Sequence, residues 1–212
     1  MLVDKKHAGE RGFIIGGGPS INQIMQDGFR FSSLKNEVTI AVNRSYKLLR
    51  STYLYYQDNY IWETFGAEIL RLPKKTKIIC PFSAYGAGND RVTPFDTIQQ
   101  ANLHGTFNKP MGTKNNAGVT ALRIAYTLGL NPIYLIGIDL NREDALPSKF
   151  NFHTDYDPKR QAKISPEKID LFKKYFIQTI EELERVGVQT FSCSKTSSLN
   201  AFIPYVDIKN IL

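Results

Sequence analysis

Short apolar runs alternate along the chain with longer segments in which apolar residues recur at helical spacing. The runs have the length and β-rich composition of buried strands and cover residues 12–15, 38–42, 53–56, 76–81, 132–138 and 188–193. The helical pattern covers residues 60–70, 116–128 and 166–186. Strands and helices that alternate in this way build parallel sheets with helices on both faces. The pattern therefore predicts an α/β fold of Rossmann-like type, with a mostly parallel central sheet flanked by helices.

Two segments follow neither pattern. Residues 82–114 are rich in Gly, Asn, Pro and Thr, and we expect them to form an irregular excursion over the sheet. Residues 141–165 combine aromatic residues and His153 with many charged residues. That composition is typical of a mobile lid whose aromatic residues cover a ligand and whose cations pair with the ligand's negative charge. The alternative is a disordered surface segment. Without a linker-like stretch, residues 1–212 are expected to form a single nucleotide-binding domain with a lid at about 141–165.

The first apolar run breaks into a glycine turn before a helix-compatible segment. Gly16, Gly17 and Gly18 are followed by Pro19 and Ser20. Glycines let the backbone approach a phosphate closely, and the free N–H groups at a helix start favour an anion. Ser20 could cap the helix or donate its hydroxyl to the ligand. The turn matches neither a Walker loop nor the full dinucleotide fingerprint, so a phosphate site and a βα turn without a ligand both stay open.

Polar residues directly follow several of the predicted strands. Asn43 follows the second apolar run, and Gln57 and Asp58 follow the third. Asp139 stands at the carboxyl end of the run 132–138. The carboxyl ends of parallel strands open into the ligand crevice of an α/β sheet. These side chains are therefore candidates for contact with a ligand. The alternatives are a hydrogen bond within the turn for Asn43 and a helix cap or loop anchor for Asp139.

The helical segment that ends at Gly129 opens with a second group of candidates. Asn116 and Gly118 stand at its start. The Asn116 side chain could cap the helix or bind a ligand, since both uses need the same amide oxygen. The turn at Gly118 would then place the first helical N–H groups beside that ligand.

The charge and hydropathy of the chain indicate which kinds of molecule it binds and where in the cell it is expected. The net charge of +7 favours polyanionic partners, and a phosphate-bearing small ligand also prefers a positive cleft. The basic residues are scattered along the chain rather than clustered. We expect no transmembrane segment, because the chain has no apolar run of about 18 residues. The N-terminal residues lack a secretory apolar core, and we therefore expect a cytoplasmic protein.

Several of these blocks together carry a family resemblance. They are the glycine turn, the Val42-Asn43-Arg44 stretch, the helix from Gly118 to Gly129, the strand ending at Asp139 and the segment 193–203. Their order resembles that of the bacterial CMP-sialic-acid-dependent sialyltransferases of glycosyltransferase family 42. The same blocks occur in the wider MptE-like superfamily, which is named for a 6-hydroxymethylpterin diphosphokinase.

The resemblance implies a nucleotide-sugar-dependent, sialyltransferase-like glycosyltransferase that transfers a sugar to a hydroxyl acceptor. It implies a nucleotide-sugar donor as substrate, with no required cofactor and no bound metal. It also implies that a lid histidine acts as general base, and His153 is the histidine of this lid. The positions that match donor contacts are Gly16, Gly17, Gly18, Ser20, Asn43, Gln57, Asp58, Asn116, Gly118, Asp139 and Asn141.

Three positions differ from the family pattern and leave other functions open. Gly17, Ala117 and Asn141 stand where the sialyltransferases have Asn, Ser and Tyr. One alternative is an ATP- and Mg²⁺-dependent diphosphokinase in which Asp58 and Asp139 share the metal. Another is a non-catalytic nucleotide- or glycan-binding module. The acceptor is a glycan or another hydroxyl compound, nucleic acid is not excluded by the basic charge, and a homo-oligomer stays open.

Overall fold

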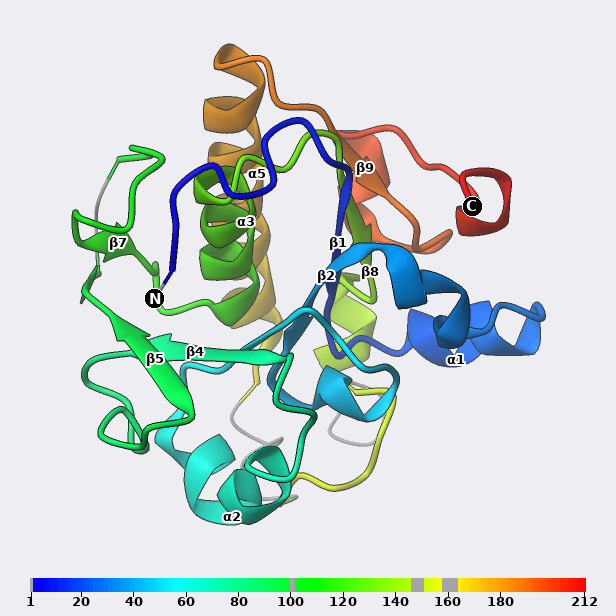
Figure 1. The fold of residues 1–212 in the computed structure, drawn as a ribbon. Helices are drawn as coiled ribbons and strands as arrows, with labels where there is room; N and C mark the ends of the chain where they lie inside the picture. Colours follow the sequence, from blue (N-terminus) through cyan, green and yellow to red (C-terminus); the bar gives the residue numbers. More distant parts are fainter. Residues whose placement is uncertain (1, 100–101, 146–150, 158–163) are drawn as a thin grey trace.

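The computed structural model describes residues 2–99, 102–145, 151–157 and 164–212 (Figure 1). Its centre is a seven-stranded sheet in which every neighbouring pair of strands is parallel. In spatial order the strands are β5 (Val92–Phe95), β4 (Lys77–Pro81), β3 (Tyr53–Tyr55), β2 (Val38–Val42), β1 (Gly12–Ile15), β8 (Ile133–Ile136) and β9 (Thr190–Ser192). The predicted α/β fold with a mostly parallel sheet is confirmed.

Helices connect these strands and cover the sheet. The α-helices are α1 (Ser20–Gln26), α2 (Asn59–Ile69), α3 (Ala117–Thr127) and α5 (Pro166–Arg185). Short 3-10 helices are η1 (Phe31–Asn36), η2 (Asn43–Lys47), η3 (Arg142–Ala145), η4 (Ser198–Ala201) and η5 (Ile208–Asn210). The start of α5 follows the sequence signal, because Ser165 Oγ accepts a hydrogen bond from Lys168 N at 3.3 Å and Pro166 occupies the first turn.

Alternate residues of each strand face opposite helical layers. Ile14 is buried in the cluster that contains α3 and α5, whereas Ile15 is buried with α1. Ile15 pairs in register with Ala41, and this row continues to Leu54 and Ile78, which pack under α2. Helices α1 and α2 therefore cover one face of the sheet, and α3 and α5 cover the other (Figure 1). Strands that are apolar on both sides are what such a layered arrangement requires.

The strand order reverses beside β1. The chain leaves β1 for β2 on one side and reaches the other side of β1 only when it returns as β8. In open parallel sheets, a crevice forms outside the carboxyl ends of the strands at such a reversal, because the two connections leave in opposite directions. In Figure 1 these carboxyl ends point toward the bottom of the view, where α2 lies.

The segment 82–114 is more regular than its composition predicts. It contains β5, which pairs with β4 and extends the main sheet, and the short strands β6 (Thr97–Ile98) and β7 (Met111–Gly112), which pair with each other. The expected irregularity is therefore wrong for the residues of these three strands. Strands of two to four residues are too short for an alternating pattern to stand out from the Gly, Pro and Thr around them.

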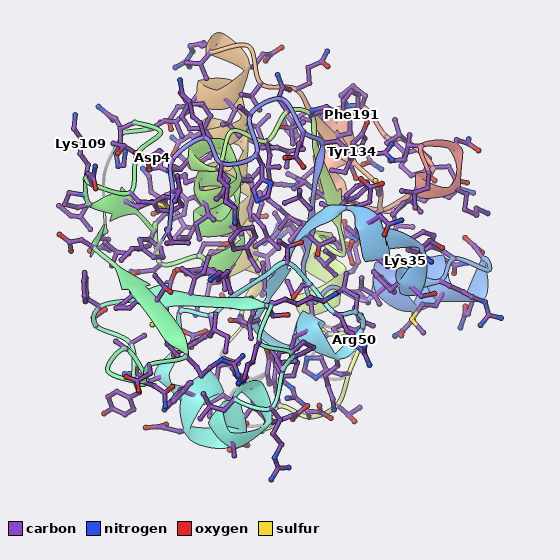
Figure 2. The ribbon with its side chains drawn as sticks, viewed as in Figure 1. Asp4, Lys35, Arg50, Lys109, Tyr134 and Phe191 are labelled. Carbon is purple, nitrogen blue, oxygen red and sulfur yellow. The ribbon has the colours of Figure 1, made fainter. Side chains whose placement is uncertain are left out.

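Two surface properties follow from the described residues. Exposed cations lie on separate elements: Lys35 is in η1, Arg50 precedes β3 and Lys109 precedes β7. In Figure 2, Lys109 lies on the opposite side of the view from Lys35 and Arg50. These three cations therefore do not form a single patch. Within the part of the chain that the structure describes, no helix has both the length and the apolar character needed to cross a bilayer.

Candidate functional site

A cavity of about 460 Å³ lies at the carboxyl edge of the sheet, where the strand order reverses. Its floor comes from the residues that follow β1, β2, β3 and β8, and its walls come from the starts of α2 and α3, from α5 and from the segment 151–157. Cavities of this size hold small-molecule ligands, and this position is where α/β sheets bind them. The cavity is therefore the candidate functional site.

The predicted site residues largely meet in this one cavity. Those that line it are Gly16, Gly17, Gly18, Asn43, Asp58, Asn116, Gly118, Asp139 and Asn141. Three others do not line it: Ser20, Gln57 and His153. Gln57 is used inside the fold, since its Oε1 accepts hydrogen bonds from the hydroxyls of Tyr55 at 3.0 Å and Thr120 at 3.3 Å.

Close packing leaves no room for a side chain at Gly16 or Gly18 of the glycine turn, whereas Gly17 faces the cavity. A Cβ on Gly18 would lie 2.4 Å from Asp139 Oδ2, a distance that real side chains do not tolerate. A Cβ on Gly17 would meet only Asn151 Oδ1, at 3.3 Å. A side chain at position 18 would thus disturb the fold, whereas a side chain at position 17 would enter the space in which a ligand would approach the backbone.

The Asp139 carboxylate is held by the start of α1. Asp139 is 4% exposed, its Oδ2 accepts the Ser20 N–H at 2.8 Å, and its Oδ1 accepts the Ser20 hydroxyl at 2.5 Å. The residue before α1 is Pro19, which has no side chain able to cap, so Asp139 supplies the cap from the loop that follows β8. Asp139 therefore serves as the loop anchor and cap that the sequence left open, and it lines the cavity at the same time.

Asn43 presents an unused polar atom at the site. Its backbone has φ of 53°, a left-handed conformation that Asn tolerates better than most residues. Its Oδ1 is buried and has no hydrogen-bond partner among the described residues. A buried acceptor without a donor costs free energy, and such atoms in native structures often have a functional explanation. Asn43 is thus a candidate for contact with a ligand.

Left-handed backbone conformations gather around the cavity. Among the non-glycine residues that the structure describes, φ is positive at Lys5, Asn43, Lys114, Asn115 and Leu140, and three of these, Asn43, Asn115 and Leu140, line the cavity. Such conformations cost free energy and persist where the surrounding structure imposes them, which in many proteins is a ligand site. Their grouping supports the assignment of this cavity as a functional site.

Asn116 has the capping role that the sequence offered as one alternative. Its Oδ1 accepts hydrogen bonds from Gly118 N at 2.9 Å and Val119 N at 3.1 Å at the start of α3. Both Asn116 and Gly118 also line the cavity. Asp58, by contrast, is exposed and lines the cavity from the loop after β3. The carboxylate of Asp58 is therefore accessible to a ligand hydroxyl or to solvent.

Part of the predicted lid packs against the cavity. Of residues 141–165, the structure describes 141–145, 151–157 and 164–165, while the rest of the predicted lid lies outside the described residues. Phe152 N donates to Gly17 O at 2.9 Å, and Asp157 N lies 3.1 Å from the Tyr60 hydroxyl. The segment 151–157 is thus attached at one end to the glycine turn and at the other end to α2. Its mobility stays a prediction.

His153 lies in this segment and is packed between two aromatic rings. Its ring centroid is 4.8 Å from that of Phe152 and 4.5 Å from that of Tyr156. Burial lowers the pKa of His153 to about 4, and the charge of Asp155 only partly opposes this. Nδ1 accepts a hydrogen bond from Asp155 N at 3.2 Å, so the proton of the neutral ring lies on Nε2. That Nε2 is buried without a partner among the described residues.

The lowered pKa of His153 predicts a loss of stability in mild acid. The pKa falls from 6.5 to about 4 in the folded state, so the unfolded chain binds more protons between these values. Stability from the neutral ring is fully present above pH 6.5 and is lost as the pH falls toward 4. We expect the melting temperature of His153→Gln to decrease less from pH 7 to pH 4.5 than that of the wild type. Equal pH slopes for both proteins would contradict this assignment.

Sequence reasoning missed the wall that α5 contributes. Lys168, Phe172 and Phe176 line the cavity and recur every four residues, so they lie on one face of the helix. Lys168 Nζ lies 5.7 Å from the centroid of the Phe172 ring. The four-residue spacing was visible in the sequence. It did not reveal the site, because a helix that packs against a hydrophobic core and a helix that lines a ligand cavity show the same spacing of apolar residues. Tyr60, Tyr156 and Asn151 of the opposite wall were likewise not predicted.

Comparison with known proteins places this fold among solved structures. No protein-family model matches the chain, and none of the curated proteins is similar to it in sequence. The sialyltransferase CstII of Campylobacter jejuni in complex with cytidine 5′-monophosphate superposes with a TM-score of 0.59 and 18% identity over 93% of this chain and 85% of that chain. The chain has the fold of a sialyltransferase.

Two further structures show the same likeness. The α-2,3-sialyltransferase Cst-I of Campylobacter jejuni gives a TM-score of 0.57 with 17% identity, over 97% of this chain and 82% of that chain. CST-II in complex with a trisaccharide acceptor and CMP gives a TM-score of 0.53 with 19% identity, over 92% and 86%. With identities this low, the likeness establishes the fold of this chain and nothing beyond it.

Proposed function

We propose that this protein is a glycosyltransferase that transfers a sugar from a cytidine-nucleotide donor to a hydroxyl acceptor. The observation that carries the proposal is the cavity at the strand-order reversal of a sialyltransferase-like fold, lined by the glycine turn, Asn43, Asp58 and Asp139. The sialyltransferases of this fold are described in complex with CMP and with a trisaccharide acceptor. In this proposal the donor is a substrate, and no metal or other cofactor takes part.

The glycine turn would receive the phosphate of the donor. At position 17 the backbone meets the cavity without an intervening Cβ, which leaves room for close approach. The unpaired Oδ1 of Asn43 would accept a hydrogen bond from the base or the ribose, since it has no protein donor among the described residues. Lys168 on α5 would add positive charge on the far wall of the cavity.

His153 would act as the general base. In the transfer step its ring takes the proton of the acceptor hydroxyl while that oxygen bonds to the anomeric carbon of the sugar. The bond from this carbon to the phosphate oxygen breaks, and the nucleotide leaves with the electron pair. In the structure, Nδ1 accepts the hydrogen bond from Asp155 N, and the His153 ring does not line the cavity. Proton transfer to this ring therefore requires segment 151–157 to shift toward the acceptor. The partnerless Nε2 supports such a second arrangement.

The two alternative functions receive less support from the site. A diphosphokinase would need the Asp139 carboxylate for Mg²⁺, yet both of its oxygens accept hydrogen bonds from Ser20. A non-catalytic binding module would share the cavity and is separated from an enzyme only by assay. A cytoplasmic location and a relation to the wider MptE-like proteins stay predictions from the sequence.

Nucleotide binding tests the proposal directly. Thermal shifts with CMP, UDP, GDP and ATP, each with and without Mg²⁺, should show stabilisation by CMP that does not need Mg²⁺. At a ligand concentration a hundred times Kd, a chain of this size should gain about 5–10 °C. Gly17→Val should lower CMP affinity about 10- to 100-fold, since the added methyl groups obstruct a charged hydrogen bond from the Gly17 N–H. The N–H groups of Gly16, Gly18 and Ser20 already donate inside the fold.

Gly18→Val is the matched control for this turn. Its Cβ would collide with the Asp139 carboxylate, so it should lower the melting temperature of the free protein, which Gly17→Val should leave nearly unchanged. Unchanged CMP affinity in a folded Gly17→Val protein would contradict the phosphate site. Stabilisation by ATP with Mg²⁺ and none by CMP would favour the diphosphokinase alternative.

A further inference from the structure

The segment 151–157 brings an amide side chain to the glycine turn. Asn151 lines the cavity, and its Oδ1 lies 3.3 Å from the point where a Cβ on Gly17 would stand. The next residue, Phe152, donates its backbone N–H to Gly17 O at 2.9 Å and so fixes the distance between segment and turn. The amide of Asn151 has no hydrogen bond to any residue that the structure describes. Its Oδ1 lies beside the space that the missing side chain at position 17 leaves open.

A buried arginine holds the same segment from the other side. The Arg44 side chain is 3% exposed, and its guanidinium donates to Asp155 Oδ2 at 2.5 Å and to Glu68 Oε2 at 2.8 Å. Its central carbon lies 3.7 Å from the centroid of the Phe65 ring. Arg44 thus joins η2, α2 and the segment 151–157 through one charged group. Lys47 adds an exposed contact to Asp155 Oδ2 at 2.8 Å.

The contact between Arg44 and Asp155 is of the kind that fixes geometry. A guanidinium keeps its charge at every accessible pH, and a buried charge must be paired to avoid a large desolvation cost. The hydrogen bonds from Arg44 and Lys47 lower the pKa of Asp155 to about 2, which shows that the carboxylate form is strongly favoured. Moving Asp155 away would leave Arg44 with Glu68 as its remaining charged partner among the described residues. The pair therefore favours the docked arrangement of the segment.

We propose that Asn151 is a ligand-contacting residue of this site and that Arg44, acting through Asp155, is the residue that positions it. The inference rests on the proposed nucleotide-binding function for the identity of the ligand. Asn151 would donate or accept a hydrogen bond to the part of the donor that lies beside Gly17. The glycine at position 17 then serves two purposes: it lets the ligand reach the backbone, and it leaves room for an amide that arrives from a distant part of the chain.

Equilibrium binding of CMP to the full chain tests the ligand contact. Asn151→Ala should weaken CMP binding about tenfold, the loss expected for one hydrogen bond to a ligand. Asp155→Asn should weaken it by a similar factor, and Asp155→Glu should restore most of the affinity. If Asp155 acts through Asn151, the double variant should bind CMP no more weakly than Asn151→Ala alone. Wild-type affinity in Asn151→Ala, or additive losses in the double variant, would overturn the inference.

Hydrogen exchange in the free protein tests the positioning without any ligand. Asp155→Asn should speed exchange at the Phe152 and Asp157 amides about tenfold or more, while amides of the strands β1 and β8 stay protected. Lys47→Ala is the matched control, because it removes only the exposed contact to Asp155, and such pairs contribute little. Unchanged exchange in Asp155→Asn would overturn the positioning role. A wild-type protein that fails to bind CMP would instead contradict the proposed function, and the exchange result would still decide whether Arg44 holds the segment.

Discussion

Replacing His153 with alanine is expected to slow sugar transfer about a hundred- to ten-thousand-fold, the range that a positioned general base contributes. CMP affinity should stay within a few-fold of the wild type, because the ring does not line the cavity. Release of CMP from a CMP-activated sugar, measured with and without an acceptor, would check both statements. The physical reason is that the acceptor hydroxyl is a poor nucleophile until a base removes its proton.

His104→Ala is the matched control for this experiment. His104 lies in the loop before β7, where its Nε2 is 3.0 Å from Pro110 O, and it does not line the cavity. Its removal should leave the transfer rate unchanged. Full turnover in His153→Ala would exclude this residue as the base. A ligand-bound structure in which the His153 ring stays out of reach of the acceptor hydroxyl would do the same.

Replacing Asp139 with asparagine is expected to lower the free energy of unfolding by about 3 kcal/mol, because buried hydrogen bonds to a charged group contribute about 1.5–3 kcal/mol each. Asparagine has the same shape as aspartate. Its amide nitrogen is a donor, however, and would replace one of the two carboxylate oxygens that accept hydrogen bonds from Ser20 in the wild type. Since Asp139 also lines the cavity, we expect CMP affinity to fall as well. Chemical denaturation and CMP titration of the same variant would measure the two effects separately.

Ser20→Ala separates the two roles of Asp139. This change removes the hydroxyl partner and leaves the carboxylate and its bond to the Ser20 N–H in place. It should reproduce part of the stability loss and little of the loss in CMP affinity, because Ser20 does not line the cavity. If Asp139→Asn and Ser20→Ala lower stability alike and both keep wild-type affinity for CMP, Asp139 is a structural cap without contact to the ligand.

The sequence by itself determined the layered fold and the edge of the sheet that carries the site. Both follow from local patterns: apolar runs of strand length, helical spacing between them, and polar residues directly after strands. Because all these strands are parallel, residues at their carboxyl ends must meet, and Asn43, Asp58 and Asp139 do so in one cavity. The glycine turn was identified in the same way, since its chemistry lies within a few consecutive residues.

Only the tertiary structure decided which partner each polar side chain takes. The cap that Asp139 gives to α1 joins residues 119 positions apart, and the pair of Arg44 and Asp155 joins residues 111 positions apart. No local pattern carries such information, because the contacts depend on the register of the sheet and on the path of the loops above it. For the same reason Gln57 was expected at the ligand but hydrogen-bonds inside the fold, whereas Asn151 was not predicted and lies beside Gly17.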